Sequence, residues 1–286
     1  MPDAVRHSDV LIVGGLTIDH FADGRTAPGG SVLHAGLAAA AEGVRPTLLT
    51  VAGDEPEARA GLEGLASLGE LVHQRAASTI AFGHEESDGR RVLVYRSAAE
   101  PIEPGRHPDL PRSGVALLAP IADEVPPAAI DAVRARFEPS LVVMLIQGWL
   151  RRLAPGDPVQ PLALDTVDPR IWEAFGAADA IVVSTEDLAE GPEDPFRQAA
   201  SLRARIGSGP ILVLTLGARG YLLDDPHADR IIASRPRTVV DGVPSVGAGD
   251  TFGAVLAIHL ARGDEPVDAA NAASNRVIAT LEGRRA

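Results

Sequence analysis

The sequence Gly247-Ala248-Gly249-Asp250 places a carboxylate directly after a turn of small residues, and an apolar stretch at 251–260 follows. That stretch predicts a buried helix. Glycines before a helix expose backbone N–H groups, and the helix dipole adds about half a positive charge, so the turn predicts an anion site that needs no lysine. Asp250 has two interpretations. It either caps the helix, or it takes the proton of a substrate hydroxyl while the amides hold a phosphoryl group.

This turn is not the only glycine-rich position near a predicted helix or strand. Asp19 follows the first predicted strand, and Gly29-Gly30 leads into the first predicted helix. In the C-terminal half, T-L-G-A-R-G places Gly217 and Gly220 on either side of a turn. In an open parallel sheet, ligands bind beyond the carboxyl ends of the strands, where loops lead into helices.

Composition limits the classes of function. The chain has 286 residues, 45% of them hydrophobic, and a net charge of -13. No block of basic residues occurs, which argues against a nucleic acid or an anionic membrane as a partner. The longest apolar run, 141–146, is too short to span a bilayer, and the N-terminus lacks a signal-peptide pattern. We therefore expect a cytoplasmic protein that acts on a small molecule.

Several catalytic chemistries are excluded by missing residues or motifs. All 26 basic residues are arginine, so neither a Schiff-base lysine nor a P-loop lysine is present. Without cysteine there is no disulfide, thiolate metal site or cysteine nucleophile. The eight histidines form no H-E-x-x-H pattern, so no structural metal is predicted, and no G-x-S-x-G motif supports a hydrolase.

Apolar runs bounded by glycine, proline or polar residues predict strands that alternate with helices along most of the chain. Ser31 is the expected N-cap of the first helix and Gly43 its end. This order predicts a single α/β domain, residues 1–286, with a parallel sheet covered by helices on both faces. The expected strands are 9–15, 47–53, 115–120, 141–146, 162–165, 180–184, 211–217 and 230–234, and the expected helices are 31–43, 57–69, 127–137, 195–206, 250–262 and 266–281.

Residues 79–97 interrupt the alternation. Two strand-like runs around Ser87-Asp88-Gly89 predict a hairpin. An isolated hairpin is marginally stable in water, so we expect it to gain strands from the N-terminal segment or from a second subunit. The resulting β-lid would comprise segments of about 16–28 and 79–98. Glu85 and Glu86 on it either form a solvated face or contact substrate hydroxyls.

Taken in order, the Gly-Gly helix start, T-L-G-x-x-G and G-A-G-D-T-F resemble the motifs of the ribokinase/PfkB family of carbohydrate kinases. The resemblance extends from Asp9 to about Gly283. It implies a ribokinase-like three-layer sandwich with a mostly parallel central sheet and a small β-sheet lid that closes over the substrate. In many members the lids of two subunits pair, which implies a homodimer.

The resemblance also implies roles for individual residues. Asp250 would be the base that deprotonates the acceptor hydroxyl, and the amides of the preceding turn would stabilise the γ-phosphoryl group in transfer. His34 stands where the family has asparagine, and is interpreted as an altered acceptor contact or a structural histidine. The implied turn residues are Gly247, Ala248 and Gly249, and the implied acceptor-binding residues are Asp19, Gly29, Gly30 and His34.

The phosphate donor implied by the resemblance is ATP with Mg²⁺. S-T-E-D at 184–187 stands where the family has an N-x-x-E segment that supports Mg²⁺ and phosphates. No residue is assigned as a direct metal ligand, and Asp187 would act through water. The implied nucleotide-binding residues are Ser184, Asp187, Thr215, Gly217, Gly220 and Ser274.

Other positions depart from the family pattern. Pro244-Ser245-Val246 replaces a segment in which the family often has an acid that supports a monovalent-cation site, and Asp241 lies three positions too early. Activation by potassium is therefore not expected. I-Q-G-W-L-R-R at 146–152 is similar to a motif of the inositol-kinase-like branch. Within it Trp149 is interpreted as core packing, and Arg151 pairs either with phosphate or with acids.

The sequence thus predicts an ATP-dependent phosphotransferase that acts on a hydroxyl of a sugar, polyol or nucleoside. The alternative is a non-catalytic descendant that binds a sugar or nucleotide as a sensor. The intact Asp250 and glycine turn favour the enzyme, and the changes at 184–187 and before the turn favour the sensor.

Overall fold

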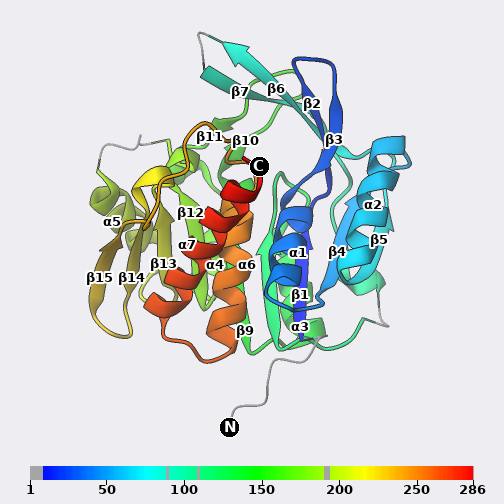
Figure 1. Ribbon diagram of the computed structural model, residues 1–286. Helices are drawn as coiled ribbons and strands as arrows, with labels where there is room; N and C mark the ends of the chain where they lie inside the picture. Colours follow the sequence, from blue (N-terminus) through cyan, green and yellow to red (C-terminus); the bar gives the residue numbers. More distant parts are fainter. Residues whose placement is uncertain (1–8, 88–89, 108–109, 190–193, 286) are drawn as a thin grey trace.

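The computed structural model describes residues 9–87, 90–107, 110–189 and 194–285. A nine-stranded sheet runs through the middle of the molecule in the order β15-β14-β13-β12-β9-β8-β1-β4-β5 (Figure 1). Neighbouring strands from β13 to β5 are parallel, and β14 and β15 extend the sheet antiparallel. The strands are Val10–Gly14 (β1), Thr47–Ala52 (β4), Glu70–Arg75 (β5), Val115–Ala119 (β8), Leu141–Leu145 (β9), Ala180–Ser184 (β12), Ile211–Thr215 (β13), Tyr221–Asp225 (β14) and Arg230–Ser234 (β15).

Helices cover both faces of this sheet, as expected for apolar strands buried on both sides. Helices α1, α2, α6 and α7 pack on one face, and α3, α4 and α5 on the other. In β1, Val10 and Ile12 point to the first layer, whereas Leu11 and Val13 point to the second. The helices are Ser31–Ala41 (α1), Pro56–Leu68 (α2), Pro127–Phe137 (α3), Pro169–Gly176 (α4), Pro195–Ile206 (α5), Ala248–Ala261 (α6) and Pro266–Gly283 (α7).

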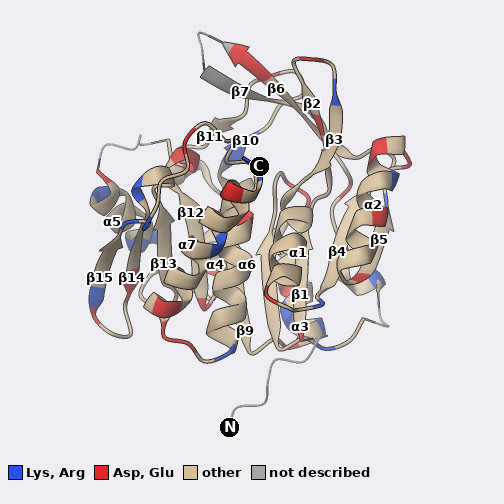
Figure 2. Cartoon of the chain, in the orientation of Figure 1, with Lys and Arg blue, Asp and Glu red and all other residues tan. Residues whose placement is uncertain are grey.

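The strand order places a topological switch point at the centre of the sheet. From β1 the chain proceeds outward to β4 and β5, then returns to β8 on the other side of β1. Ligands in open α/β sheets bind beyond the carboxyl ends of the strands at such a point. The strands there, β1, β8 and β9, contain no charged residue, and charged residues lie instead in loops, on helices, on outer strands of the sheet and in the second sheet (Figure 2).

A second sheet of four strands lies beyond one end of the central sheet (Figure 1). We call it the lid sheet; it comprises β3 (Thr26–Gly29), β2 (Thr17–Phe21), β6 (Ile80–Ser87) and β7 (Arg90–Ser97) in that order. The hairpin β6–β7 pairs through β6 with β2, so the prediction that it gains a strand from the N-terminal segment is confirmed. The turn residues Asp88 and Gly89 lie outside the described residues.

A short two-stranded sheet connects the lid sheet to the body of the protein. Its strands are β10 (Arg151–Arg152) and β11 (Gln160–Pro161). Between them, the N–H of Gly156 donates to the carbonyl of Tyr95 at 2.8 Å and the N–H of Val159 donates to the carbonyl of Leu93 at 2.8 Å. The segment therefore covers the outer edge of β7.

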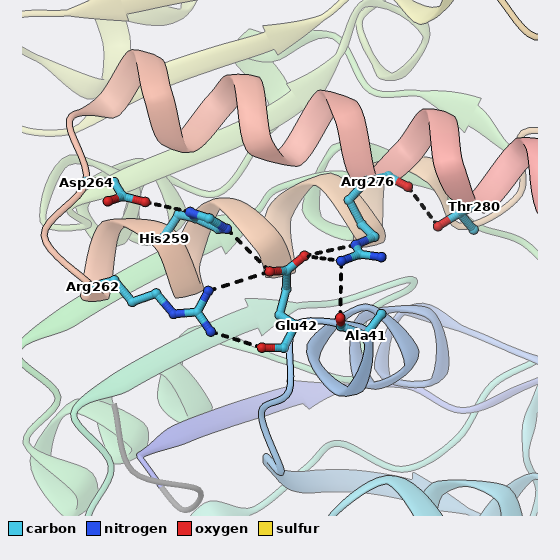
Figure 3. A network of polar contacts seen from close by, with 7 residues as sticks. All are labelled: Ala41, Glu42, His259, Arg262, Asp264, Arg276 and Thr280. Carbon is cyan, nitrogen blue, oxygen red and sulfur yellow. Dashed lines mark hydrogen bonds and ion pairs between the residues drawn. The ribbon is translucent and has the colours of Figure 1, made fainter. Parts of the chain in front are cut away.

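A network of charged side chains joins the C-terminal ends of α1 and α6, which lie away from the lid, to the middle of α7 (Figure 3). Glu42, just after α1, accepts from Arg276 at 2.8 Å and also faces Arg262 at 3.5 Å and His259 at 3.4 Å. His259 contacts Asp264 at 2.6 Å through its other ring nitrogen. These contacts tie α1 to the consecutive helices α6 and α7, with Glu42 and Arg262 separated by 220 positions in the sequence.

Some sequence-based element assignments were wrong. Residues 162–165 do not form a strand; a 3₁₀ turn occupies Leu164–Thr166, because so short a run behind Pro161 specifies no strand pairing. Ser31 is not the N-cap of α1, which is Gly30 with a φ of 98°. The hydroxyl of Ser31 donates instead to the carbonyl of Ala119 and joins α1 to β8. Strands β5 and β14 and helix α4 were missed; β5 lies at an edge of the sheet and alternates polar with apolar residues.

Within the part of the chain that the structure describes, no helix is both long and apolar enough to cross a bilayer.

Candidate active site

The turn that precedes α6 presents backbone amides at the start of that helix. Gly247 is its N-cap, with a φ of 75° that favours glycine. The N–H of Ala248 donates to the carbonyl of Ser245 at 3.0 Å, so this amide, which the sequence assigned to the anion site, is already engaged. N–H groups in the first turn of a helix have no intrahelical acceptor. The amide of Gly249 is therefore suited to an anion, whereas the N–H of Asp250 bonds to its own carboxylate; the space beside the Cα of Gly249 is open.

Asp250 is a buried carboxylate and not a cap. It is the third helical residue of α6, and no side chain caps this helix. Only 5% of the residue is exposed. Burial raises the pKa of Asp250 to about 6, with a smaller contribution in the same direction from Asp187, whereas Arg151 and a hydrogen bond from Gln147 act to lower it. A carboxylate with this pKa accepts a proton near neutral pH more readily than an exposed one.

Three side chains beside Asp250 form a continuous polar chain. The amide nitrogen of Gln147 donates to Oδ1 of Asp250 at 3.1 Å. The carbonyl oxygen of the same Gln147 side chain accepts from Nη2 of Arg151 at 3.0 Å, and this nitrogen also contacts Oδ1 of Asp187 at 3.3 Å. Asp187, expected to support Mg²⁺, is thus engaged by an arginine. Gln147 was missed from the sequence, where a glutamine after an apolar strand carries no distinguishing signal.

The close packing of α6 on β9 brings these groups together. A side chain at Gly253 would overlap Leu145, so glycine lets the helix approach the end of the strand. Gln147 lies two residues after the end of β9, and Asp250 lies one turn before Gly253 on the helix. Trp149 is buried, donates to the carbonyl of Val125 at 2.6 Å and belongs to the core as interpreted from the sequence.

The acceptor residues expected from the sequence gather around Asp19 on β2. Asp19 is 8% exposed; it accepts from the Thr17 hydroxyl at 3.1 Å and lies 3.3 Å from Nε2 of His84. A Cβ at Gly29 would lie 2.5 Å from the Asp19 carboxylate, and one at Gly30 would overlap the backbone of residue 15. Both glycines therefore make room for groups that approach closely.

His34 lies between this group and the α6 turn. Its ring packs against Gly247, where any side chain would overlap the imidazole. Its Nε2 atom is buried and has no hydrogen-bond partner among the described residues. Burial lowers the pKa of His34 to about 4; Arg284 acts in the same direction and Asp19 in the opposite one. The imidazole is therefore neutral at physiological pH.

Glu124 joins the two central strands at the switch point. Its buried carboxylate accepts from the N–H groups of Gly15 at 2.7 Å, Ile121 at 2.9 Å and Ala122 at 2.9 Å. Burial raises its pKa, although these backbone donors act against that shift. This acid holds the segment after β1 against the segment after β8 and was not singled out from the sequence.

The residues expected to bind the donor lie at the ends of β12 and β13 and on α7. Ser184 accepts from the N–H of Glu186 at 3.2 Å and begins a 3₁₀ turn at Thr185–Asp187 (η4). Gly217 has a φ of 59° with open space beside it, whereas Gly220 packs against the carbonyl of Ser234. Gly220 is thus required by strand packing. The remaining two, Thr215 and Ser274, lie at the end of β13 and on α7.

The loop before the glycine turn is held by an arginine. Nη1 of Arg284 donates to the carbonyls of Pro244 at 3.1 Å and Val246 at 2.8 Å. The Arg284 guanidinium thus already binds carbonyl oxygens of residues 244–246, where the ribokinase/PfkB family often has an acid. Sequence reasoning missed Arg284, which lies beyond the last predicted helix.

No three His, Asp or Glu side chains in the described ranges come together in a way that could hold a metal ion. Mg²⁺ typically keeps several waters and binds one or two carboxylates together with substrate phosphates. Asp187 already faces Arg151, so it would reach Mg²⁺ only through water, and the donor phosphates would supply most of the ligands.

Comparison with known proteins gives two kinds of match. Residues 151–279 match the family model described as pfkB family carbohydrate kinase. A curated relative, ATP-dependent 6-phosphofructokinase isozyme 2 of Mycobacterium tuberculosis, is 34% identical over 110 residues, which are 36% of this chain and 31% of the relative. The aligned part is thus less than a third of that enzyme.

Solved structures match over almost the whole chain. A pyrophosphate-dependent kinase in the ribokinase family, complexed with a pyrophosphate analog and myo-inositol, has a TM-score of 0.77 at 16% identity and covers 96% of this chain and 95% of its own. Ribokinase of Arabidopsis thaliana, complexed with ribose and ATP, has a TM-score of 0.73 at 16% identity, with 96% and 92% covered. Fructokinase of Vibrio cholerae O395 reaches 0.68 at 19% identity, with 96% and 99% covered. At these identities the matches show the fold, which is ribokinase-like.

Proposed function

The chain contains a PfkB family carbohydrate kinase domain in a ribokinase-like fold, and on this premise we propose that it transfers a phosphoryl group to a hydroxyl of a small sugar, polyol or nucleoside. Asp250 is the base in this proposal. The observation that carries it is the position of this carboxylate, which is buried, has a pKa of about 6 and lies in the first turn of α6 beside amides that have no intrahelical acceptor.

In the proposed reaction the acceptor hydroxyl gives its proton to Asp250 as its oxygen forms a bond to the terminal phosphorus of the donor. The bond from that phosphorus to the bridging oxygen breaks, and the leaving group keeps the electron pair. The amide of Gly249 and the helix dipole stabilise the negative charge on the phosphoryl oxygens. Bound Mg²⁺ would neutralise charge on the donor phosphates.

Asp19 and His34 support the acceptor side of this proposal. The carboxylate of Asp19 accepts hydrogen bonds from sugar or polyol hydroxyls, and the unpartnered Nε2 of neutral His34 offers one further donor or acceptor. His34 packs against Gly247, and Asp19 is close enough to affect the pKa of His34, so an acceptor bound between Asp19 and His34 would lie near the turn that carries Asp250.

The phosphate donor is proposed to be ATP, as in the ribokinase named above. A second donor is tested beside it, because another of the solved structures is described as a pyrophosphate-dependent kinase. Open space at Gly217 and Gly249 supports phosphates near the ends of β13 and α6 and does not by itself select between the two donors.

A donor-by-acceptor screen tests the function. The protein is incubated with Mg²⁺ and either ATP or pyrophosphate, with inositols, ribose, fructose, ketodeoxygluconate and nucleosides as acceptors. Phosphorylated product is detected by mass spectrometry. Product formation that Asp250→Asn abolishes supports the proposal. Binding of a sugar or nucleotide by calorimetry without any product would instead support the sensor.

A further inference from the structure

We propose that Gln147 and Arg151, with Asp187 as the counterion of Arg151, are positioning residues that fix the orientation of the Asp250 carboxylate. This inference rests on the proposed function of Asp250 as a base. None of the three is a catalytic residue in it, since each acts through another side chain.

The hydrogen-bonding capacities of the side chains determine the direction of the chain. An arginine guanidinium has only donors, so the oxygen of the Gln147 amide must face Arg151. The amide NH₂ then faces Asp250 and donates to Oδ1. Rotating the amide by half a turn would place NH₂ against the guanidinium and carbonyl oxygen against carboxylate, which loses both bonds. Arg151 therefore decides that Gln147 presents a donor to Asp250.

Arg151 is itself held from three directions. Its Nη1 donates to the carbonyl of Ile121 at 3.0 Å, and its Nη2 contacts Gln147 at 3.0 Å and Asp187 at 3.3 Å. The side chains of Arg151 and Asp187 are each 13% exposed, so their ion pair is largely shielded from water. This cation and this anion shift the pKa of Asp250 in opposite directions.

The other ionisable groups near the turn are few. His34 packs against Gly247 from α1, and Arg284 bonds to the loop before it. Arg151 lowers the pKa of Asp250 and Asp187 raises it, whereas His34 is neutral at physiological pH. Removing Arg151 should therefore raise the pKa of Asp250, and neutralising Asp187 should lower it.

The test is a pH titration of the Asp250 carboxyl by carbon NMR, with the signal assigned from its loss in Asp250→Asn. In Arg151→Met the midpoint should rise by about one pH unit, and in Asp187→Asn it should fall by about half a unit or more. The double variant loses both charges and should titrate between the two. Arg151→Met leaves Asp187 without its counterion, which can prevent folding. In that case the double variant is measured in its place. Gln147→Leu should raise the midpoint without changing any charge.

Arg152→Met is the matched control. It removes the same charge one residue along β10, from an exposed side chain that bonds to Gln160, and should leave the midpoint of Asp250 unchanged. An Asp250 midpoint that is unmoved in Arg151→Met and in Asp187→Asn, or that moves equally in Arg152→Met, overturns the proposal.

Kinase assays separate this outcome from the proposed function. In an active enzyme, the acid limb of kcat/KM should shift with the NMR midpoint in each variant. If no donor and acceptor react, the proposed function fails, yet the NMR titration still decides whether these residues set the state of the carboxylate.

Discussion

Replacing Asp250 by asparagine should separate the chemical role of this residue from its structural cost. Asparagine keeps the acceptor oxygen that Gln147 bonds to, but it takes up no proton. General-base catalysis is worth roughly 10²–10⁴-fold in rate, so kcat should fall by at least about a hundredfold. In the native enzyme, turnover should itself fall as the pH drops through about 6, because Asp250 becomes protonated.

The same change should stabilise the protein at alkaline pH. The pKa of Asp250 rises from 3.8 to about 6 on folding, so the native state binds the proton more tightly than the unfolded state does. Stability from this group is therefore complete below pH 3.8 and is lost as the pH rises through about 6. A shift of about two units corresponds to up to about 3 kcal/mol in free energy of unfolding. An uncharged asparagine side chain carries no such cost, so Asp250→Asn should melt several degrees above the native protein at pH 8, and the difference should close by pH 4.

The assay is steady-state turnover together with melting curves at pH 4 and pH 8. Asp268→Asn is the control, because Asp268 occupies the same third helical position in α7 but is exposed. It should retain turnover and change stability by only a few tenths of a kcal/mol. Near-normal turnover of Asp250→Asn would refute the role of Asp250 as the general base. A melting-temperature difference that does not change with pH would refute the reasoning from burial of the charge.

Three other changes test separate parts of the structure. His34→Ala should raise the KM of the acceptor by roughly three- to tenfold, the value of one hydrogen bond, and leave the KM of the donor unchanged; loss of stability alone would make His34 a core residue. Potassium in place of tetramethylammonium should alter turnover little, because Arg284 already occupies two carbonyls of the loop, and a rise of about tenfold or more would contradict this. Glu42→Gln should lower the melting temperature at pH 7 by a few degrees. Burial acts to raise the pKa of Glu42, but Arg276 and His259 lower it overall, so the stability that Glu42 provides is present above its unfolded pKa and is lost as the pH falls through the lower folded value. A melting difference that persists unchanged at pH 3.5 would count against the network.

Local sequence pattern was sufficient to predict most of the architecture. Apolar runs and helical periodicity predicted seven of the nine strands of the central sheet and six of its seven helices, because a strand buried on both faces leaves a continuous apolar run. The hairpin at 79–97 was predicted from two strand-like runs around Ser87-Asp88-Gly89. The missed elements have separate reasons: β5 is half exposed, β14 has only three apolar residues before Asp224 and Asp225, and α4, although amphipathic, has only eight residues.

The chemistry of the candidate base was also partly readable. Gly247 and Asp250 are close in the sequence, so their spacing alone places a carboxylate beside amides that lack intrahelical acceptors. The interpretation of Asp250 as a cap or a base could not be decided at that level. It depends on whether the side chain points to the helix backbone or into the interior, and the structure shows it buried without a capping bond.

What surrounds Asp250 was decided by the tertiary structure. Gln147 and Asp250 are separated by 103 positions, yet they are hydrogen-bonded because β9 and α6 pack directly against each other. Asp187 reaches Arg151 because β9 and β12 are parallel neighbours, and the carboxyl ends of parallel neighbours meet at one edge of the sheet. The sequence alone shows which residues follow each strand. Which strands become neighbours depends on how all strands and helices bury their apolar faces together, and this is determined only in the folded chain.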